Sequence, residues 1–343
     1  MPRRGGRILV TMLLMLAACG GGAPTYELTG RTMGTQFSVQ IAGSTSGGER
    51  AKLQQEIEGA LATVEQQMST YLLQSDISKF NASPSTGWIA VSASTCHAVE
   101  VAEDVSELSN GAFDVTVGSL VNLWGFGPDP VQVKPPPDSA ISAALERVGY
   151  RRLHTDCAQP ALRKDSPDVY VDLSAYAKGF GADRVAELLD FRGIRNYLVE
   201  IGGELRLRGR DVDGELWAVA IEAPADNGRT LSRIVKLTDT AMATSGDYRN
   251  FFEYEGRRYS HTIDPHTGRP TTHNLASVTV ISETAALADA MATALLVLGP
   301  DEGFDLAARE QIAAYFQLRT GNGFEERTTP AFRAFDEPPI IER

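Results

Sequence analysis

The chain has 343 residues, of which 43% are hydrophobic, and its 32 basic and 44 acidic residues give a formal net charge of −12. A chain of this length can bury a large core as one elaborate domain or as two lobes. The acidic balance argues against contact with a phosphate backbone, so we expect no nucleic-acid partner.

The N-terminus has the plan of a secretory signal peptide over residues 1–18, with three arginines followed by an apolar run. That run is about eleven residues, short of the roughly 20 that span a bilayer. Cys19 follows Leu-Ala-Ala, which resembles a bacterial lipobox; ordinary cleavage beside an incidental cysteine is the alternative. Residues 19–25 would then be the lipidated cysteine and a flexible tether, and 26–343 a single domain. Loss of residues 1–18 lowers the formal net charge by three, from −12 to −15.

From the signal-peptide pattern and the lipobox, we expect a lipid-anchored protein on the periplasmic side of a bacterial membrane, inner or outer.

The other two cysteines are Cys96 and Cys157. They can form a disulfide in an oxidising compartment, but the sequence does not show that they meet. The sequence has no CxxC motif and no Cys/His cluster, so we expect no structural zinc, haem c or iron–sulfur site.

The first elements predicted along the chain are a strand pair and three helices. Residues 26–43 alternate as two strands. A helix is predicted within 47–71 from apolar residues at helical spacing, namely Leu53, Ile57, Leu61, Val64 and Met68. A second helix within 94–113 should end near Asn110-Gly111, and a third over 138–149 should begin with Asp138 as its cap.

The second half is dominated by strands. Residues 168–173 are predicted as a strand that stops at Ser174 and leads into a helix over 175–193. Two strands within 196–209 flank Gly202-Gly203, a two-residue hairpin signal. More strands are expected in 216–224, 233–246, 249–265 and 275–282, before a final helix from Thr284 to Leu298. This order predicts an α+β fold of mainly antiparallel sheets with flanking helices.

Three places carry candidate chemistry, and the first is the start of the helix after residue 173. Ser174 is suited to cap it, and the free N–H groups of a helix start bind phosphate. Lys178 in the first turn opposes the helix dipole unless an anion offsets it. An ordinary capping serine with a surface lysine is the structural alternative.

The second place is His261. If Arg258–Ile263 form a strand, then Tyr259, His261 and Ile263 share one face and His261 lies at a strand end. A core histidine is the structural alternative, and His266 or His273 could be the functional histidine instead.

The third place is the final helix, in which Asp289 and Thr293 lie four residues apart on one face. A buried aspartate needs a partner, which could be a helix terminus, a salt bridge or a bound cation. Two oxygen donors on one face suit a hard cation such as Mg²⁺.

Together these segments resemble the FAD:protein FMN transferases of the ApbE family, over nearly the whole chain after residue 30. The resemblance rests on RTMGT (31–35), STYLLQSDISKFN (69–81), NGAFDVTVGSLVNLWGFG (110–127), VDLSAYAKGFGADRVAELL (171–189), YLVEIGGELRLRG (197–209), ATSGDYRNFF (243–252), SHTIDPHTGRP (260–270) and DAMATALLVLG (289–299).

The resemblance implies a two-lobed ApbE-like fold, FAD as substrate and Mg²⁺ as cofactor. The residues it implies at the FAD site are Met33, Tyr71, Ala112, Phe113, Asp114, Asp172, Lys178 and Ile263. Ala175, through its carbonyl, Asp289 and Thr293 would hold Mg²⁺, with Ala292 nearby, and His261 would be the catalytic base. The implied reaction transfers FMN to a threonine or serine of a partner and releases AMP. The implied partners are subunits of membrane redox complexes, such as a sodium-pumping NADH:quinone reductase.

Three alternatives stay open at this point: an FAD pyrophosphatase, a non-catalytic flavin-binding lipoprotein and a solute-binding lipoprotein. The presence of His261 together with Asp289 and Thr293 favours an enzyme, because a binding protein has no use for a base beside its metal.

Overall fold

The computed structural model describes residues 25–335, except residues 45, 129–133, 225–229, 249 and 322. The predicted signal peptide, Cys19 and most of the tether lie outside these residues, so those predictions stay predictions. Within the described part of the chain, no helix is long and apolar enough to cross a membrane.

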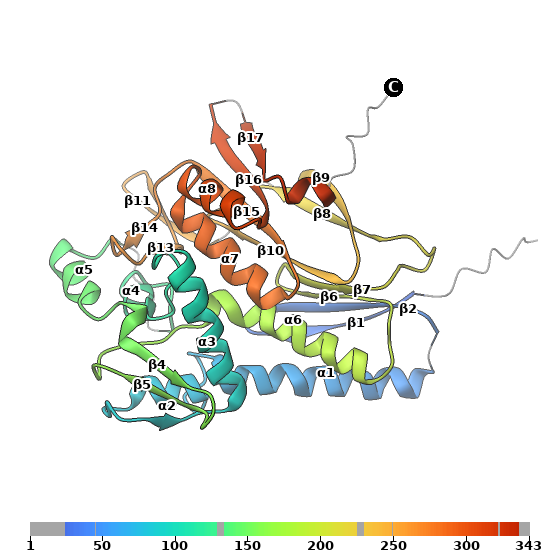
Figure 1. Ribbon diagram of the computed structural model, residues 1–343, viewed down its shortest axis with the longest axis horizontal. Coiled ribbons are helices and arrows are strands. Elements are labelled where there is room, and N and C mark those ends of the chain that lie inside the picture. The colour runs from blue at the N-terminus through green and yellow to red at the C-terminus, as the bar shows by residue number, and fades with distance from the viewer. Residues whose placement is uncertain are drawn as a thin grey trace, which may run out of the picture.

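An eight-stranded antiparallel sheet forms the centre of the fold (Figure 1). Its strands, in spatial order, are β1 (Thr25–Thr32), β2 (Thr35–Ala42), β6 (Tyr197–Ile201), β7 (Glu204–Arg208), β10 (Thr240–Gly246), β15 (Leu275–Ser282), β16 (Ala313–Thr320) and β17 (Gly323–Thr328). The predicted α+β class with mainly antiparallel sheets and flanking helices is confirmed.

Three helices pack on one face of this sheet: α1 (Gly47–Met68), α6 (Ser174–Phe191) and α7 (Ala285–Leu298). The five apolar residues that predicted the first helix are the buried residues of α1. Ser46 caps α1 in a capping box with Glu49, which satisfies free N–H groups at the helix start. Amphipathic spacing therefore gave both the position and the buried face of α1.

The opposite face of the sheet is covered by the hairpin of β8 (Trp217–Ala223) and β9 (Thr230–Leu237). Trp217, Val219 and Ile221 of β8 form a core cluster with Leu205 and Met242 of the sheet. Helices, sheet and hairpin therefore make three layers.

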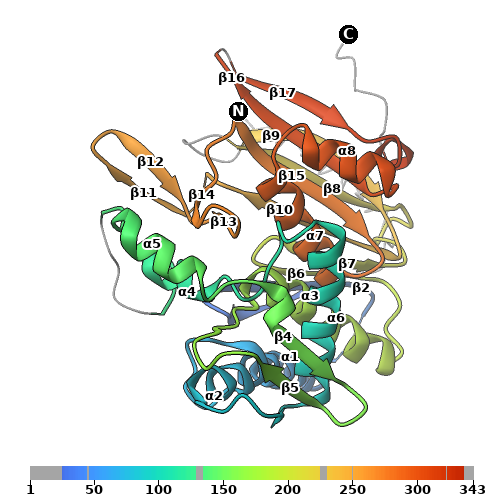
Figure 2. The ribbon, with the colours of Figure 1, turned by 60° about the vertical axis from the view of Figure 1, so that its left-hand side comes forward.

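The remaining elements surround these layers, and Figure 2 shows α4, α5 and β11–β14 gathered on one side of the large sheet. They are α2 (Asp76–Ala82), β3 (Ile89–Ala90), α3 (Ala93–Leu108), α4 (Gly118–Leu123), α5 (Asp138–Leu145), η1 (Tyr150–Arg152), β4 (Leu153–Asp156), β5 (Ala161–Lys164), β11 (Phe251–Tyr254), β12 (Arg257–Ser260), β13 (Ile263–Asp264), β14 (Arg269–Pro270), α8 (Glu302–Arg309) and η2 (Phe332–Phe335). The predicted end of the second helix is confirmed, since Asn110 and Gly111 follow α3 with positive φ angles of 52° and 84°.

The strand predicted over 168–173 is wrong. The segment is extended and buries alternate residues, but it makes only an isolated bridge between Tyr170 and Val117. The side chain of Asn81 takes the place of a neighbouring strand, accepting from Val171 N and donating to Val171 O, both at 2.8 Å. The alternation of buried and less buried residues in this segment is typical of a strand, but the segment does not pair as one.

Two further predictions about helix ends are also wrong. Asp138 is the first residue of α5 rather than its cap, because Pro137 occupies that position, and Asp138 instead accepts a hydrogen bond from Arg269. The helix that ends at Leu298 is not the last element, since α8, β16 and β17 follow it. The C-terminal strands complete the large sheet beside β15.

Cys96 and Cys157 form a disulfide, which answers the question that the sequence left open. Cys96 is fully buried on α3, and Cys157 follows β4, so the bond ties α3 to the β4–β5 hairpin.

Removing this disulfide should lower the free energy of unfolding. The two cysteines are 61 residues apart, and closing a loop of that size in the unfolded chain is worth about 4 kcal/mol in the chain-entropy model. Denaturant unfolding of the wild type with and without dithiothreitol measures this difference. A Cys96→Ala/Cys157→Ala variant should unfold like the reduced wild type and should not respond to the reductant. Equal stability of the oxidised and reduced wild type would contradict the prediction.

Candidate functional site

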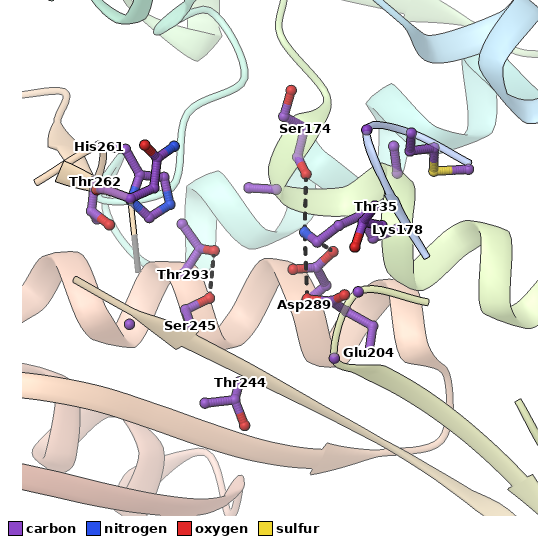
Figure 3. A pocket seen from close by; sticks show the side chains of 18 of the residues that line it. Thr35, Ser174, Lys178, Glu204, Thr244, Ser245, His261, Thr262, Asp289 and Thr293 are labelled. Carbon is purple, nitrogen blue, oxygen red and sulfur yellow. Dashed lines mark hydrogen bonds and ion pairs between the residues drawn. The ribbon is translucent and has the colours of Figure 1, made fainter. Parts of the chain in front are cut away.

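A cavity of about 1400 Å³ opens between the β1–β2 turn, the start of α6, the face of α7 that carries Asp289 and Thr293, the end of β10 and the β12–β13 connection (Figure 3). It exceeds the roughly 300–1,000 Å³ of typical small-molecule pockets, so a dinucleotide would fit. All twelve cavity residues that the sequence predicted line it: Met33, Tyr71, Ala112, Phe113, Asp114, Asp172, Ala175, Lys178, His261, Ile263, Asp289 and Thr293. Ala292 is fully buried and does not line the cavity.

The start of α6 differs from the prediction in its cap. Leu173 occupies the N-cap position, and Ser174 is the first helical residue. Asp172 Oδ1 accepts from both Ser174 N, at 2.8 Å, and Ser174 Oγ, at 2.5 Å. Ala175 departs from helical geometry, with φ −87° and ψ 16°. A carboxylate therefore takes the capping role, and the first turn of the helix is kinked at the cavity wall.

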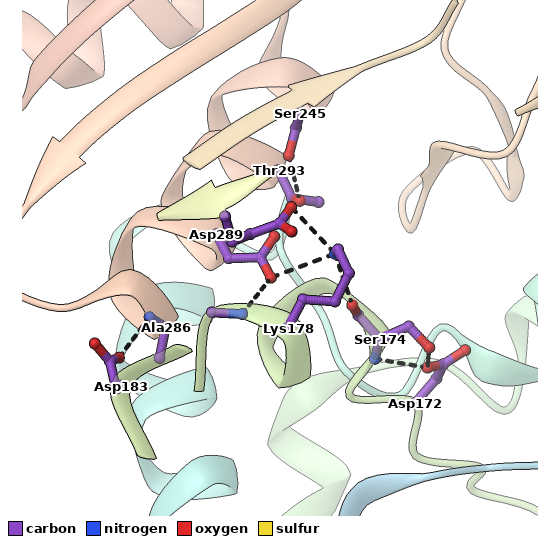
Figure 4. Close-up of polar contacts among 10 residues, drawn as sticks. Asp172, Ser174, Lys178, Asp183, Ser245, Ala286, Asp289 and Thr293 are labelled. Atoms are coloured by element: carbon purple, nitrogen blue, oxygen red, sulfur yellow. Dashed lines mark hydrogen bonds and ion pairs between the residues drawn. The ribbon is translucent and has the colours of Figure 1, made fainter. Parts of the chain in front are cut away.

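Lys178 lies near the start of α6, where its positive charge is unfavourable beside the positive end of the helix dipole. Two carboxylates offset that charge. The Nζ of Lys178 lies 3.5 Å from Asp289 Oδ2 (Figure 4). The same Nζ lies 3.4 Å from Glu204 Oε1. Burial alone would lower the pKa of Lys178, but the two carboxylates outweigh it and the pKa is raised. Burial raises the pKa of the Glu204 carboxyl above its usual range, and the Lys178 charge opposes this effect. Asp289 thus has the salt-bridge partner that was one of its three possible roles.

Oxygen donors gather on the same side of α7. Asp289 is only 3% exposed, and besides Lys178 it accepts from Gly179 N at 3.3 Å. A regular helix would direct that N–H to the carbonyl of Ala175. Thr293 Oγ1 lies 2.9 Å from Ser245 Oγ on β10. A carboxylate, two hydroxyls and a kinked backbone carbonyl are a donor set that hard cations accept. In the described ranges, no three His, Cys, Asp or Glu residues cluster as a metal site.

The tight packing of α6 against α7 holds these donors in place. A Cβ added to Gly179 would lie 2.2 Å from the carbonyl oxygen of Ala285, so only glycine allows this approach. Asp183 on α6 also accepts from the backbone N–H groups of Ala285 and Ala286, both at 2.9 Å. The relative position of Lys178 and Asp289 is therefore fixed by backbone contacts.

His261 lies in the break between β12 and β13, and the predicted continuous strand from Arg258 to Ile263 is wrong. Its backbone N–H and its ring Nδ1 both approach the carbonyl of Asn250, at 3.0 and 3.1 Å. A carbonyl accepts only, so Nδ1 carries the proton and Nε2 keeps its lone pair. Burial lowers the pKa of His261, the nearby Lys178 charge acts in the same direction, and the Asn250 contact and Asp247 oppose them. The ring is therefore neutral and basic at neutral pH.

The other two candidate histidines are elsewhere. His266 Nε2 lies 2.9 Å from the carbonyl oxygen of Asn110, in the β13–β14 turn. His273 packs against Gly299. Neither lines the cavity.

Met33 lies at the tip of the β1–β2 hairpin with a positive φ of 48°, which is strained for a residue other than glycine. Glu65 of α1 holds this tip, because its Oε1 accepts from Met33 N at 2.6 Å and from Thr32 Oγ1 at 2.9 Å. The strain is thus offset by a carboxylate that fixes the tip over the cavity.

The remaining predicted residues line other parts of the cavity. Tyr71 is 62% exposed, whereas Ala112, Phe113 and Ile263 are buried. The carboxylate of Asp114 accepts from Thr116 N, Thr116 Oγ1 and Tyr150 N, which orders the loop that carries it. Tyr71 offers a ring to a ligand, and the others shape the wall.

Four residues of the site were missed in the sequence: Glu65, Glu204, Ser245 and Asn250. Glu204 follows the recognised Gly202-Gly203 turn, so its place next to a cavity could have been inferred from that hairpin. Glu65 and Ser245 contact elements distant in the chain, and Asn250 contacts His261 at the open end of the β11–β12 hairpin. None of these three residues carries a local signal.

The sequence profile of the ApbE family matches residues 33–316, well over half of the chain. The chain belongs to the ApbE family. It is 42% identical to a Vibrio cholerae protein named FAD:protein FMN transferase, over 97% of this chain and 99% of that protein. It is 40% identical to the protein of that name from Escherichia coli K12, over 90% and 88%. The solved structure of the flavin transferase ApbE from Vibrio cholerae superposes with a TM-score of 0.85 at 42% identity, over 91% of this chain and 99% of that one. The ApbE-like fold predicted from sequence is confirmed.

Proposed function

We propose that this chain is an Mg²⁺-dependent enzyme that transfers FMN from FAD to a threonine or serine hydroxyl of a partner protein and releases AMP. One observation carries the proposal: a helix start with a lysine, an acid–hydroxyl pair and a neutral histidine line one cavity of dinucleotide size. The ApbE family and the names of its transferase members support it.

The donor set on α7 fits Mg²⁺. Asp289 supplies a carboxylate, Thr293 a hydroxyl and Ala175 a carbonyl, and Mg²⁺ takes few protein ligands when phosphate oxygens supply the rest. When bound, the cation would neutralise charge on the phosphates and stabilise the charge that develops during transfer. The positive end of the α6 dipole and Lys178 would add to that neutralisation.

His261 would act as the base. The acceptor hydroxyl oxygen bonds to the phosphorus of the FMN half, the bond from that phosphorus to the bridging oxygen breaks, and AMP leaves with that oxygen. The hydroxyl proton passes to Nε2 of His261, whose lone pair the Asn250 contact keeps available. In phosphoryl transfer, positioning of the reactants and neutralisation of charge account for most of the rate acceleration.

The three alternatives make different products. An FAD pyrophosphatase would use water in place of the hydroxyl, and a flavin-binding or solute-binding lipoprotein would make no product. The names of the relatives favour the transferase.

We propose that the acceptors are subunits of membrane redox complexes, met on the periplasmic side of a membrane to which a lipid on Cys19 holds the enzyme. The signal-peptide and lipobox patterns support this location.

The transferase can be separated from its alternatives in one assay. Purified protein is incubated with FAD, Mg²⁺ and a soluble fragment of a candidate acceptor subunit. The mass of the fragment is then measured by mass spectrometry. The fragment should gain one FMN unit with release of an equal amount of AMP. A fragment whose acceptor threonine is replaced by valine is the matched control and should gain nothing. Free FMN and AMP with an unmodified fragment would make the protein a hydrolase instead.

A further inference from the structure

The ammonium group of Lys178 is shared between two buried carboxylates. Asp289 and Glu204 side chains are only 4% and 5% exposed, and Lys178 Nζ stands 3.5 and 3.4 Å from them. Both distances exceed the roughly 2.7–2.9 Å of a tight charge-assisted hydrogen bond. The Lys178 ammonium therefore lies between two carboxylates and makes a tight hydrogen bond to neither.

The charges of this cluster do not balance. With both acids ionised, two carboxylates face one ammonium, and the buried Oε2 of Glu204 has no hydrogen-bond partner among the described residues. A buried charge without full compensation is costly, so the cluster has room for more positive charge. Asp289, which also belongs to the donor set for Mg²⁺, is where that charge would bind.

We infer that the side chain of Lys178, rather than the backbone around it, would give way to such a cation. The α6–α7 contact at Gly179 fixes the backbone on both sides. The stem of Lys178 runs past Gly202, where an added Cβ would lie 3.3 Å from Lys178 Cδ. The stem is therefore confined, but its Nζ can move from Asp289 toward Glu204 with little change in the rest of the chain.

We propose that Lys178 is an exchangeable counter-cation of the metal site: a divalent cation displaces its ammonium from Asp289, and Glu204 holds the displaced ammonium at the cavity wall beside the FAD pyrophosphate. Glu204 is thus a positioning residue that acts through Lys178. The inference rests on the proposed use of Asp289 as a metal ligand. Because binding free energies are reciprocal, metal binding and FAD binding become coupled through one lysine.

The first test measures Mn²⁺ binding in the absence of FAD, by titration calorimetry or by the electron paramagnetic resonance signal of free Mn²⁺. Lys178→Met removes the competing ammonium but keeps the apolar stem, so Mn²⁺ should bind about tenfold tighter or more. Lys52→Met removes an exposed lysine of α1 and is the matched control, with unchanged Mn²⁺ affinity. Unchanged or weaker Mn²⁺ binding in Lys178→Met would overturn the proposal.

A double-mutant cycle tests whether Glu204 acts through Lys178. Glu204→Gln leaves Lys178 with Asp289 alone, so it should weaken Mn²⁺ binding in the wild-type background and have a smaller effect in Lys178→Met. Equal effects in both backgrounds would mean that Glu204 acts only by its charge, and would overturn its assigned role. If Lys178→Met does not fold, Lys178→Met/Glu204→Gln should still bind Mn²⁺ more tightly than Glu204→Gln, and equal affinity would again overturn the proposal.

FAD binding gives a readout that simple charge removal would not produce. Lys178→Met should weaken FAD binding, followed by flavin fluorescence, more with saturating Mn²⁺ than without it, because only the metal frees the ammonium. A larger loss without Mn²⁺ would contradict the exchange. The Mn²⁺ titrations use neither FAD nor acceptor, so they stand or fall independently of the transfer assay.

Discussion

Replacement of His261 by alanine should lower the rate of flavin transfer by about 10²–10⁴-fold, the usual contribution of a positioned base. FAD binding should change little, because the groups proposed to hold the phosphates lie on α6 and α7. Single-turnover transfer to the acceptor fragment measures the rate, and flavin fluorescence measures binding. His266→Ala is the matched control, since His266 lies outside the cavity, and it should keep most of the activity.

The pH dependence gives His261 a second signature. Burial lowers its pKa below the ordinary 6.5, and the neutral ring is the active form. Transfer should therefore fall as the pH drops through that lowered pKa and stay level from there to neutral pH. The residual transfer rate of His261→Ala should not show this fall at low pH, the acid limb of the pH–rate profile. Wild-type activity in His261→Ala, or an acid limb unchanged by the substitution, would remove His261 from the mechanism.

Elements whose pattern comes from local burial could be predicted from the sequence. The apolar spacing of α1 named its five buried residues, and Gly202-Gly203 marked the β6–β7 turn. The same reasoning failed at 168–173, because an extended segment held by Asn81 has the alternating burial of a strand. Periodicity reports which faces are buried but not what hydrogen-bonds the backbone.

Contacts between distant segments could not be predicted. Cys96 and Cys157 meet only because β4 and β5 fold against α3, and Glu204 reaches Lys178 only because β7 lies beside α6 in the folded chain. Twelve residues of the cavity were nevertheless named in advance, since the resemblance to a family supplied the long-range information that spacing lacks. Glu65 lies outside its quoted motifs and was missed, and Glu204, Ser245 and Asn250 were missed although they lie within them.

In our proposal, Asp289 combines a structural role with a functional one. The sequence offered a salt bridge and a bound cation as separate explanations for an acid in an alanine-rich helix. The salt bridge to Lys178 is present, and in our proposal the ammonium of Lys178 gives way there to a divalent cation. A buried acid with a movable lysine partner remains stable without metal and can still bind one, which a permanently paired aspartate could not do.

Asp289→Asn should therefore abolish the metal response while leaving the fold intact. Loss of a residue that merely orients a metal ligand commonly costs about 10–100-fold in metal affinity, so loss of the carboxylate itself should cost at least the upper end of that range. Asparagine keeps the shape of the side chain and an oxygen for the N–H of Gly179, which should preserve the α6–α7 contact. Mn²⁺ titration, Mg²⁺-dependent transfer and thermal unfolding measure the three effects separately.

The matched control for this substitution is Asp305→Asn, which neutralises an exposed carboxylate on α8 outside the cavity. It should leave Mn²⁺ affinity and transfer at wild-type values, because its charge is separated from the site by solvent and screening. An Asp289→Asn protein that folds and keeps its Mg²⁺ dependence would show that the cation binds elsewhere. In that case the acid would serve only as the partner of Lys178, and the donor set on α7 would have to be reassigned.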